Sequence, residues 1–136
     1  MNRLVSILIT SALLVTTIAF APADPPSAGV HHAEVKEHSI KSCIECIRAC
    51  RQCLIDCDCD GSEKHCLACV ETCRACIALM EYDSPLCGEM CSLCEKACDA
   101  CAKACRECAM RTCQEECASA CETCRDACRA MAESML

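Results

Sequence analysis

The chain has 136 residues, of which 22 are cysteine, and its length is that of one small domain. Aromatic residues are almost absent, with one Phe, one Tyr and no Trp, and the three Gly and four Pro exclude a loop-rich or collagen-like chain. The net charge of −7 is opposite in sign to that typical of nucleic-acid-binding proteins, and it disfavours docking on an anionic membrane surface. The functional question is therefore what the sulfur atoms bind.

Residues 1–23 have the three parts of a secretory signal peptide. A basic start with Arg3 precedes an apolar run over residues 4–20, and a small-x-small cleavage site ends at Ala23. The apolar run is short for a membrane span and polar residues follow it at once, while a lone arginine does not make a twin-arginine signal. We therefore expect cleavage, export to the periplasm by the general secretory route, and no membrane attachment afterwards.

Helical periodicity dominates the rest of the chain. Residues 24–29, with two Pro and one Gly, predict a flexible leader. Four periodic stretches follow, at about 30–58, 63–82, 85–109 and 113–134. Ser84 and Pro85 predict the N-cap and the first position of the third helix. The last boundary lacks Gly and Pro, but one helix from Pro85 onward would be about 75 Å long, too long for this domain. The sequence therefore predicts an all-α, up-down four-helix bundle with a cysteine-lined core over residues 30–136.

The cysteines follow a regular spacing within each predicted helix. Their steps alternate between three and four residues, which is the inward seam of a helical bundle. Cysteine therefore occupies the positions where a bundle normally carries Leu or Ile. Cys59 lies in the predicted connection between the first and second helices, and Cys113 falls one position off the seam. The seam positions are Cys43, Cys46, Cys50, Cys53, Cys57, Cys66, Cys69, Cys73, Cys76, Cys87, Cys91, Cys94, Cys98, Cys101, Cys105, Cys108, Cys117, Cys121, Cys124 and Cys128.

The core lacks bulky hydrophobic residues. Residues 94–135 contain no Val, Ile, Leu, Phe, Tyr or Trp, so the inner face of the last two helices consists of Cys, Ala and Met. Thiols are small, weakly polar groups, and burying one contributes less than the about 1.5–3 kcal/mol of a Leu or Ile side chain. We infer that a ligand with affinity for sulfur completes this core.

Three kinds of sulfur site fit the pattern less well than a copper site. A disulfide framework is the default for a small exported chain with an even cysteine count, but partners three or four residues apart on one helix meet disulfide geometry poorly. The ferredoxin pattern needs consecutive steps of three, which do not occur. Zinc ions held by four thiolates would bury net negative charge.

Copper(I) satisfies both the chemistry and the charge. Soft thiolates select Cu(I), and one Cu⁺ per thiolate leaves a buried core neutral. All 22 cysteines are candidate ligands, and the chain would hold multiple Cu(I) ions. No nucleophile–base pair or phosphate loop is visible, so we expect storage or buffering of copper rather than catalysis. A disulfide-stapled helical structural or interaction protein is the alternative.

Methionine and histidine gather at one end of the predicted bundle. Met80 continues the seam of the second helix, and Met131 and Met135 continue that of the fourth. His32 and His38 lie at the start of the first helix, at the same end. These residues predict a weaker, exchangeable Cu(I) uptake site, with a purely apolar plug as the alternative.

Two aliphatic stripes run beside the cysteine seams. Ile40, Ile47 and Leu54 repeat every seven residues, as do Val70 and Ile77. Because cysteine already fills the seams, we expect these stripes to form a subunit interface, with packing within the bundle as the alternative.

Two stretches carry a resemblance to a known family. They are Ala-Cys-Arg-Glu-Cys-Ala at residues 104–109 and Cys-Arg-Asp-Ala-Cys-Arg-Ala-Met-Ala at residues 124–132. The pattern over residues 31–135 resembles the bacterial copper storage proteins, cysteine-lined four-helix bundles that hold many Cu(I) ions. The resemblance implies a homo-oligomer, commonly a tetramer, with copper ions as its partners.

Overall fold

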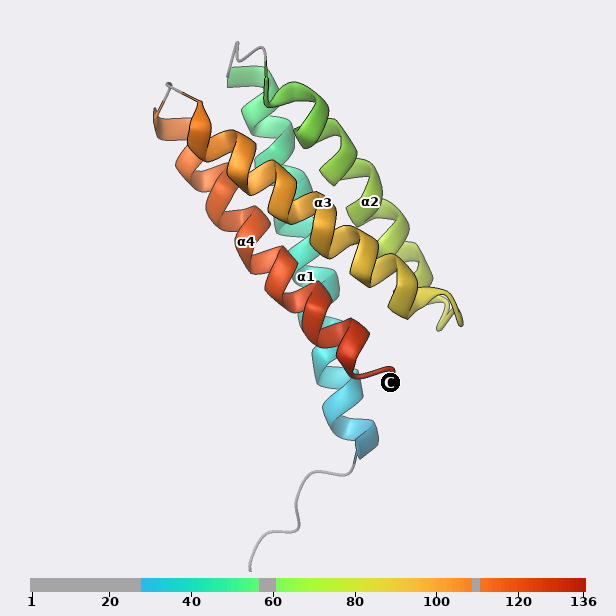
Figure 1. The fold of residues 1–136 in the computed structure, drawn as a ribbon. Coiled ribbons are helices and arrows are strands. Elements are labelled where there is room, and N and C mark those ends of the chain that lie inside the picture. The colour runs from blue at the N-terminus through green and yellow to red at the C-terminus, as the bar shows by residue number, and fades with distance from the viewer. Residues whose placement is uncertain (1–27, 57–60, 109–110) are drawn as a thin grey trace, which may run out of the picture.

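Four helices make up the structure, a computed structural model in which the described residues are 28–56, 61–108 and 111–136; side chains in the last range are described from residue 115. The helices are α1 (Ala28–Asp56), α2 (Glu63–Glu81), α3 (Cys87–Glu107) and α4 (Arg111–Glu133). They run alternately up and down, with the start of α1, the α2–α3 turn and the C-terminus towards one end (Figure 1). Within the described ranges no helix is both long enough and apolar enough to cross a membrane.

Each helix packs against two neighbours. α1 lies against α2 and α4, and α3 completes the square by packing against α2 and α4. The predicted all-α, up-down four-helix bundle is thereby confirmed, with its inward seams meeting along a central axis. α1 begins at Ala28, so two residues of the predicted leader are helical.

The end of α2 reverses the chain through a Schellman motif. Asp83 adopts a left-handed conformation with φ 48°. The Ser84 N–H donates to the carbonyl of Leu79 at 3.0 Å, and the Asp83 N–H donates to that of Met80 at 3.2 Å. Aspartate tolerates this conformation better than most residues other than glycine, and the motif satisfies two carbonyls that the helix leaves without partners.

The start of α3 differs from its predicted position. The helix begins at Cys87 with Leu86 as its N-cap, two residues later than predicted. Ser84 instead closes a separate turn: its hydroxyl oxygen accepts the Leu86 N–H at 3.3 Å and its carbonyl accepts the Cys87 N–H at 3.0 Å. Pro85 lies inside this turn and not at the first position of α3. The Schellman motif ends α2 just before it, so Ser84 and Pro85 form the connection between the two helices.

The aliphatic stripes pack in part against the core of their own chain, and a subunit interface along their exposed surface stays a prediction. Ile40, Ile47, Leu54 and Ile77 are partly buried against the core, and Val70 is buried. They flank the cysteine seams of α1 and α2, where the two helices need side-chain bulk that thiols do not supply.

The contact between α3 and α4 has a different character. Small residues lie in it: Ala102 and Ala118 are buried, and a Cβ added at Gly88 would make a van der Waals contact with Met135 at 3.7 Å. On the outer side, three ion pairs connect the two helices at the surface. These pairs are Arg106–Glu122, Arg125–Asp99 and Arg129–Glu95.

We expect the buried alanines of this contact to tolerate little added volume. Ala118→Leu inserts a larger side chain between packed helices, so the free energy of unfolding of the metal-free, reduced protein should fall by about 1–3 kcal/mol. Ala130→Leu, on the exposed face of the same helix, is the control and should change it little. Urea unfolding followed by circular dichroism measures both. Equal stability of the two variants would contradict the packing described here.

Candidate metal centre

The centre of the bundle is a column of free thiols. Eighteen cysteines are free and buried, and each is at most 2% exposed. All four helices contribute, because the alternating steps of three and four place each sulfur on the inward face. The eighteen are Cys43, Cys46, Cys50, Cys53, Cys66, Cys69, Cys73, Cys76, Cys87, Cys91, Cys94, Cys98, Cys101, Cys105, Cys117, Cys121, Cys124 and Cys128.

Sulfur atoms of different helices lie close to one another without being bonded. The Sγ atoms of Cys76 and Cys91 are 3.3 Å apart, and Cys46 Sγ lies 3.4 Å from Cys69 Sγ and 3.6 Å from Cys121 Sγ. These separations are well beyond the about 2.05 Å of a disulfide bond. The thiols are therefore placed to share a soft metal ion between helices.

The sulfurs form groups of four that overlap along the column. In each group all four Sγ atoms lie within 4.8 Å of one another. Because neighbouring groups share members, the column is a continuous run of sulfur ligands rather than a set of isolated sites. Five of these groups are Cys43–Cys73–Cys94–Cys124, Cys43–Cys76–Cys94–Cys128, Cys46–Cys69–Cys73–Cys98, Cys46–Cys50–Cys69–Cys121 and Cys50–Cys101–Cys117–Cys121.

The thiols influence one another's ionisation. Burial, together with the Cys91 thiol nearby, raises the pKa of Cys87 to about 12. The pKa of Cys91 is raised to about 11, chiefly by its hydrogen bond with Cys128. By contrast, hydrogen bonds from Cys124 and Cys128 lower the pKa of Cys43 to about 3. Hydrogen bonds and burial within the column therefore shift thiol pKa values in both directions, and a metal ion must displace protons from the thiols whose pKa is raised.

Methionine replaces cysteine at the end of the column near the C-terminus. Met80 and Met131 are each 1% exposed and belong to the same buried cluster as the thiols. Ser39, which precedes Cys43 by one seam step, is also buried here, and its hydroxyl donates to the carbonyl of Ala127 at 2.9 Å. We call this end, defined by Ser39, Met80, Cys87 and Met131, the methionine end.

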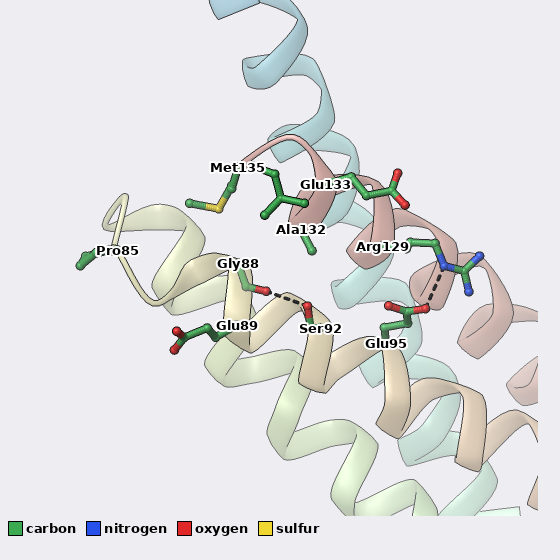
Figure 2. Close-up of a pocket in the computed structure, with 10 residues that line it drawn as sticks. Pro85, Gly88, Glu89, Ser92, Glu95, Arg129, Ala132, Glu133 and Met135 are labelled. Atoms are coloured by element: carbon green, nitrogen blue, oxygen red, sulfur yellow. Dashed lines mark hydrogen bonds and ion pairs between the residues drawn. The ribbon is translucent and has the colours of Figure 1, made fainter.

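Met135 lies outside the buried cluster. It is 40% exposed and lines an open groove of about 490 Å³ between the start of α3 and the end of α4. Figure 2 shows its sulfur on the same side of the groove as Gly88, with the Glu95–Arg129 ion pair further along. Met135 therefore presents a thioether at the surface, beside the methionine end.

The two predicted histidines occupy different places. His32 is partly buried, and its Nδ1 lies 3.1 Å from the hydroxyl oxygen of Ser134 at the end of α4. His38 is exposed and lines a groove on the side of the bundle, between α1 and α4, with Ser42 and Thr123. The structure thus brings His32, but not His38, to the methionine end.

Four predicted ligands are not among these eighteen cysteines. Cys57 and Cys59 lie outside the described residues, and Cys113 lies in α4 where no side chain is described. Cys108, directly after α3, is disulfide-bonded. A ligand role for these four stays a prediction, and for Cys108 it requires the reduced form.

Two serines at the methionine end were missed by sequence reasoning. Ser39 could have been found, since the seam reaches it four residues before Cys43. Ser134 carries no such signal, because its position beside His32 depends on how α1 meets the end of α4.

Comparisons with known proteins agree with this architecture. The family model of copper storage proteins matches residues 32–133. Apo copper storage protein 3 from Bacillus subtilis shares 37% identity over 71% of this chain and 97% of that chain, with a TM-score of 0.66. The Cu(I)-bound copper storage protein BsCsp3 shares 31% identity over 72% of this chain and 98% of that chain, also with a TM-score of 0.66.

A further similar structure is the Nmul_A1745 protein from Nitrosospira multiformis. It shares 28% identity over 74% of this chain and 97% of that chain, with a TM-score of 0.63. No curated protein sequence matches. The predicted resemblance is confirmed by the family model and by relatives that share both the bundle and about a third of the aligned residues: the chain belongs to the copper storage protein family.

Proposed function

We propose that this chain is an exported protein that stores or buffers Cu(I), holding many ions per chain through its core thiolates. The observation that carries the proposal is the continuous column of eighteen buried, free cysteines. Membership of the copper storage protein family supports it, as does the Cu(I)-bound structure of a relative.

Charge favours Cu(I) over a divalent ion in this core. A buried group carrying net charge is strongly disfavoured unless it is compensated, and the column lies among apolar side chains. One Cu⁺ per thiolate is neutral, whereas Zn²⁺ held by four thiolates has a net charge of −2. Ions added one after another can therefore fill the column without accumulating buried charge.

The disulfide-stapled alternative finds little support in the geometry. The cross-helix sulfurs of the column are separated by 3.3 Å or more, and these cysteines are free. They also lie in a packed four-helix bundle, whereas small disulfide scaffolds generally lack such a core. Among the cysteines whose side chains are described, the disulfide-bonded one is Cys108, directly after α3.

We place copper uptake at the methionine end. Thioethers bind Cu(I) without losing a proton or adding charge, so Met80 and Met131 should hold it more weakly than thiolates and pass it inward. His32 and the exposed thioether of Met135 would take part at the surface, and His38 would act only as an outlying ligand.

The rest of the proposal concerns location and assembly. Residues 1–23 would direct export to the periplasm by the general secretory route, after which the chain would act without membrane attachment or catalysis. We further propose a homo-oligomer, in line with the tetramer implied by the family resemblance. Half-exposed Ile44 on α1 and Leu67 on α2 are candidates for its interface.

Anaerobic titration of the reduced protein with Cu(I) tests the proposal. We expect binding of many equivalents against a competing chelator, and a rise in Tm as copper is added. Replacing Cys98, Cys101 and Cys105 together by Ser should lower the capacity in proportion to the thiols removed. Cys59→Ser, outside the predicted seam, is the control and should lower it much less. Saturation at a single equivalent would contradict storage, and equal losses in both variants would contradict the column.

The affinity for Cu(I) should rise with pH. Cys87 and Cys91, with pKa values raised to about 12 and 11, are protonated between pH 5 and 8, so binding to them must release protons. Each displaced proton makes the apparent affinity about tenfold higher per pH unit. Competition against a pH-insensitive chelator measures this dependence, and pH-independent loading would exclude thiolate ligands.

The methionines should govern the rate of exchange rather than the capacity. Replacing Met80, Met131 and Met135 by Leu keeps apolar volume, so the stability should change by less than about 1.5 kcal/mol for each substitution. We expect slower Cu(I) loading from a weak donor and slower removal by a strong chelator, at unchanged capacity. Met90→Leu, a partly buried position flanking the core, is the control. Stopped-flow traces that match the unmodified protein would show that the methionines are only an apolar plug.

A further inference from the structure

One carbonyl at the end of α4 is satisfied by a side chain. The last carbonyls of a helix lack intrahelical partners. The N–H groups of the three residues after α4 donate to the carbonyls of Ala130, Ala132 and Glu133, at 3.0–3.3 Å. None of these three N–H groups donates to the carbonyl of Met131. The Met131 carbonyl instead accepts the hydroxyl of Ser134, at 2.8 Å. The hydroxyl proton of Ser134 is therefore committed to the backbone.

That commitment assigns the tautomer of His32. A serine hydroxyl has one proton to donate, and Ser134 gives it to Met131. The contact of 3.1 Å between the Ser134 oxygen and His32 Nδ1 must then be made by a proton on Nδ1. The neutral imidazole of His32 is therefore the Nδ1–H tautomer, and its free lone pair is on Nε2. Nε2 is the nitrogen able to bind a metal ion.

The same hydroxyl connects the imidazole to a buried sulfur. Ser134 Oγ lies 3.8 Å from Met131 Sδ, so one oxygen contacts both a side chain of α1 and a thioether at the end of the column. α1 is held in place nearby by the ion pair of Lys36 with Asp83, in the turn between α2 and α3. His32 is therefore anchored at two points, by its own helix and by Ser134.

We propose that Ser134 is a positioning residue for copper uptake, holding His32 as the Nδ1–H tautomer and so presenting Nε2 to Cu(I) beside Met131. Histidines that bind metals through one ring nitrogen generally donate a hydrogen bond from the other, which fixes the tautomer and the ring orientation. Ser134 accepts that bond here. The inference rests on the proposed function and adds to it the donor atom of the uptake site and the residue that orients it.

The tautomer can be measured without any metal. Two-bond ¹H–¹⁵N spectra of the reduced, metal-free chain, recorded where the imidazole is neutral, distinguish a protonated Nδ1 from a protonated Nε2. We expect His32 to be an Nδ1–H form in the unmodified protein. In Ser134→Ala it should revert to the Nε2–H form that free histidine prefers, and Ser134→Thr should restore Nδ1–H. An Nε2–H form in the unmodified protein, or an unchanged tautomer in Ser134→Ala, would overturn the proposal.

Loading kinetics provide the functional test. Loss of a residue that orients a metal-binding histidine costs about 10–100-fold in affinity or activity, so Ser134→Ala should load Cu(I) from a weak donor about tenfold more slowly. Ser134→Thr should load at the unmodified rate. Ser92→Ala is the matched control, because the Ser92 hydroxyl also donates to a helix carbonyl, that of Gly88 at 3.1 Å, but has no imidazole partner. Loading by Ser134→Ala at the unmodified rate would overturn the proposal.

A double-mutant comparison separates positioning from helix stability. If Ser134 acts through His32, Ser134→Ala should cause no further slowing when His32 is already Ala. A further tenfold loss in that background would overturn the proposal, because it would assign the effect to the end of α4. Equilibrium Cu(I) capacity, measured in parallel, reports on the proposed function alone: it should stay unchanged in every variant, and an unmodified protein that binds no copper would contradict storage while leaving the tautomer result intact.

Discussion

The bundle depends on packing small thiols where other bundles place leucine and isoleucine. A thiol fills less space and gains less from burial than a branched aliphatic side chain, so the four helices must compensate elsewhere. They do so asymmetrically. α1 and α2 add aliphatic side chains beside the seam, whereas α3 and α4 approach through Gly and Ala and join their outer surfaces by ion pairs. The sulfur column is held between these two unlike contacts.

The thiol core can hold either protons or monovalent metal ions. Eighteen thiols in one column can be neutral in two ways, either protonated or paired with a monovalent cation. Exchange of one state for the other changes no buried charge, so the same packing accommodates both. Metals that need net negative sites lack this equivalence, so in the proposed function charge would favour Cu(I) as much as the softness of sulfur does.

The sequence predicts the column far better than the ends of the helices. A 3.5-residue spacing of cysteine specifies the inward face almost unambiguously, and all eighteen described free thiols lie on it. The start of α3 was misplaced because Asp83 takes up a left-handed conformation that ends α2, and this shifts Ser84 and Pro85 into a turn. The Ser-Pro pair is typical of a helix start, but its sequence does not reveal that the chain has already reversed at Asp83.

Contacts between distant segments account for the remaining differences. The aliphatic stripes lie at the margin of the narrow thiol core, which leaves room for them there, and their spacing alone could not distinguish this packing from a subunit interface. The role of Ser134 could not be predicted from the sequence. It depends on the Met131 carbonyl, which accepts no backbone N–H at the end of α4, and on His32, which lies 102 positions earlier in the chain.

The overlap of the sulfur groups also has a kinetic consequence. Neighbouring groups share cysteines, and the helices enclose the column on its sides, so an ion that entered at the proposed uptake site would advance by exchange from one group to the next. Movement of this kind would be single-file: ions admitted first would lie deepest, and those admitted last would leave first. A store built this way would release its outermost copper readily and retain a deep reserve, so the speed of withdrawal would depend on how full the column is.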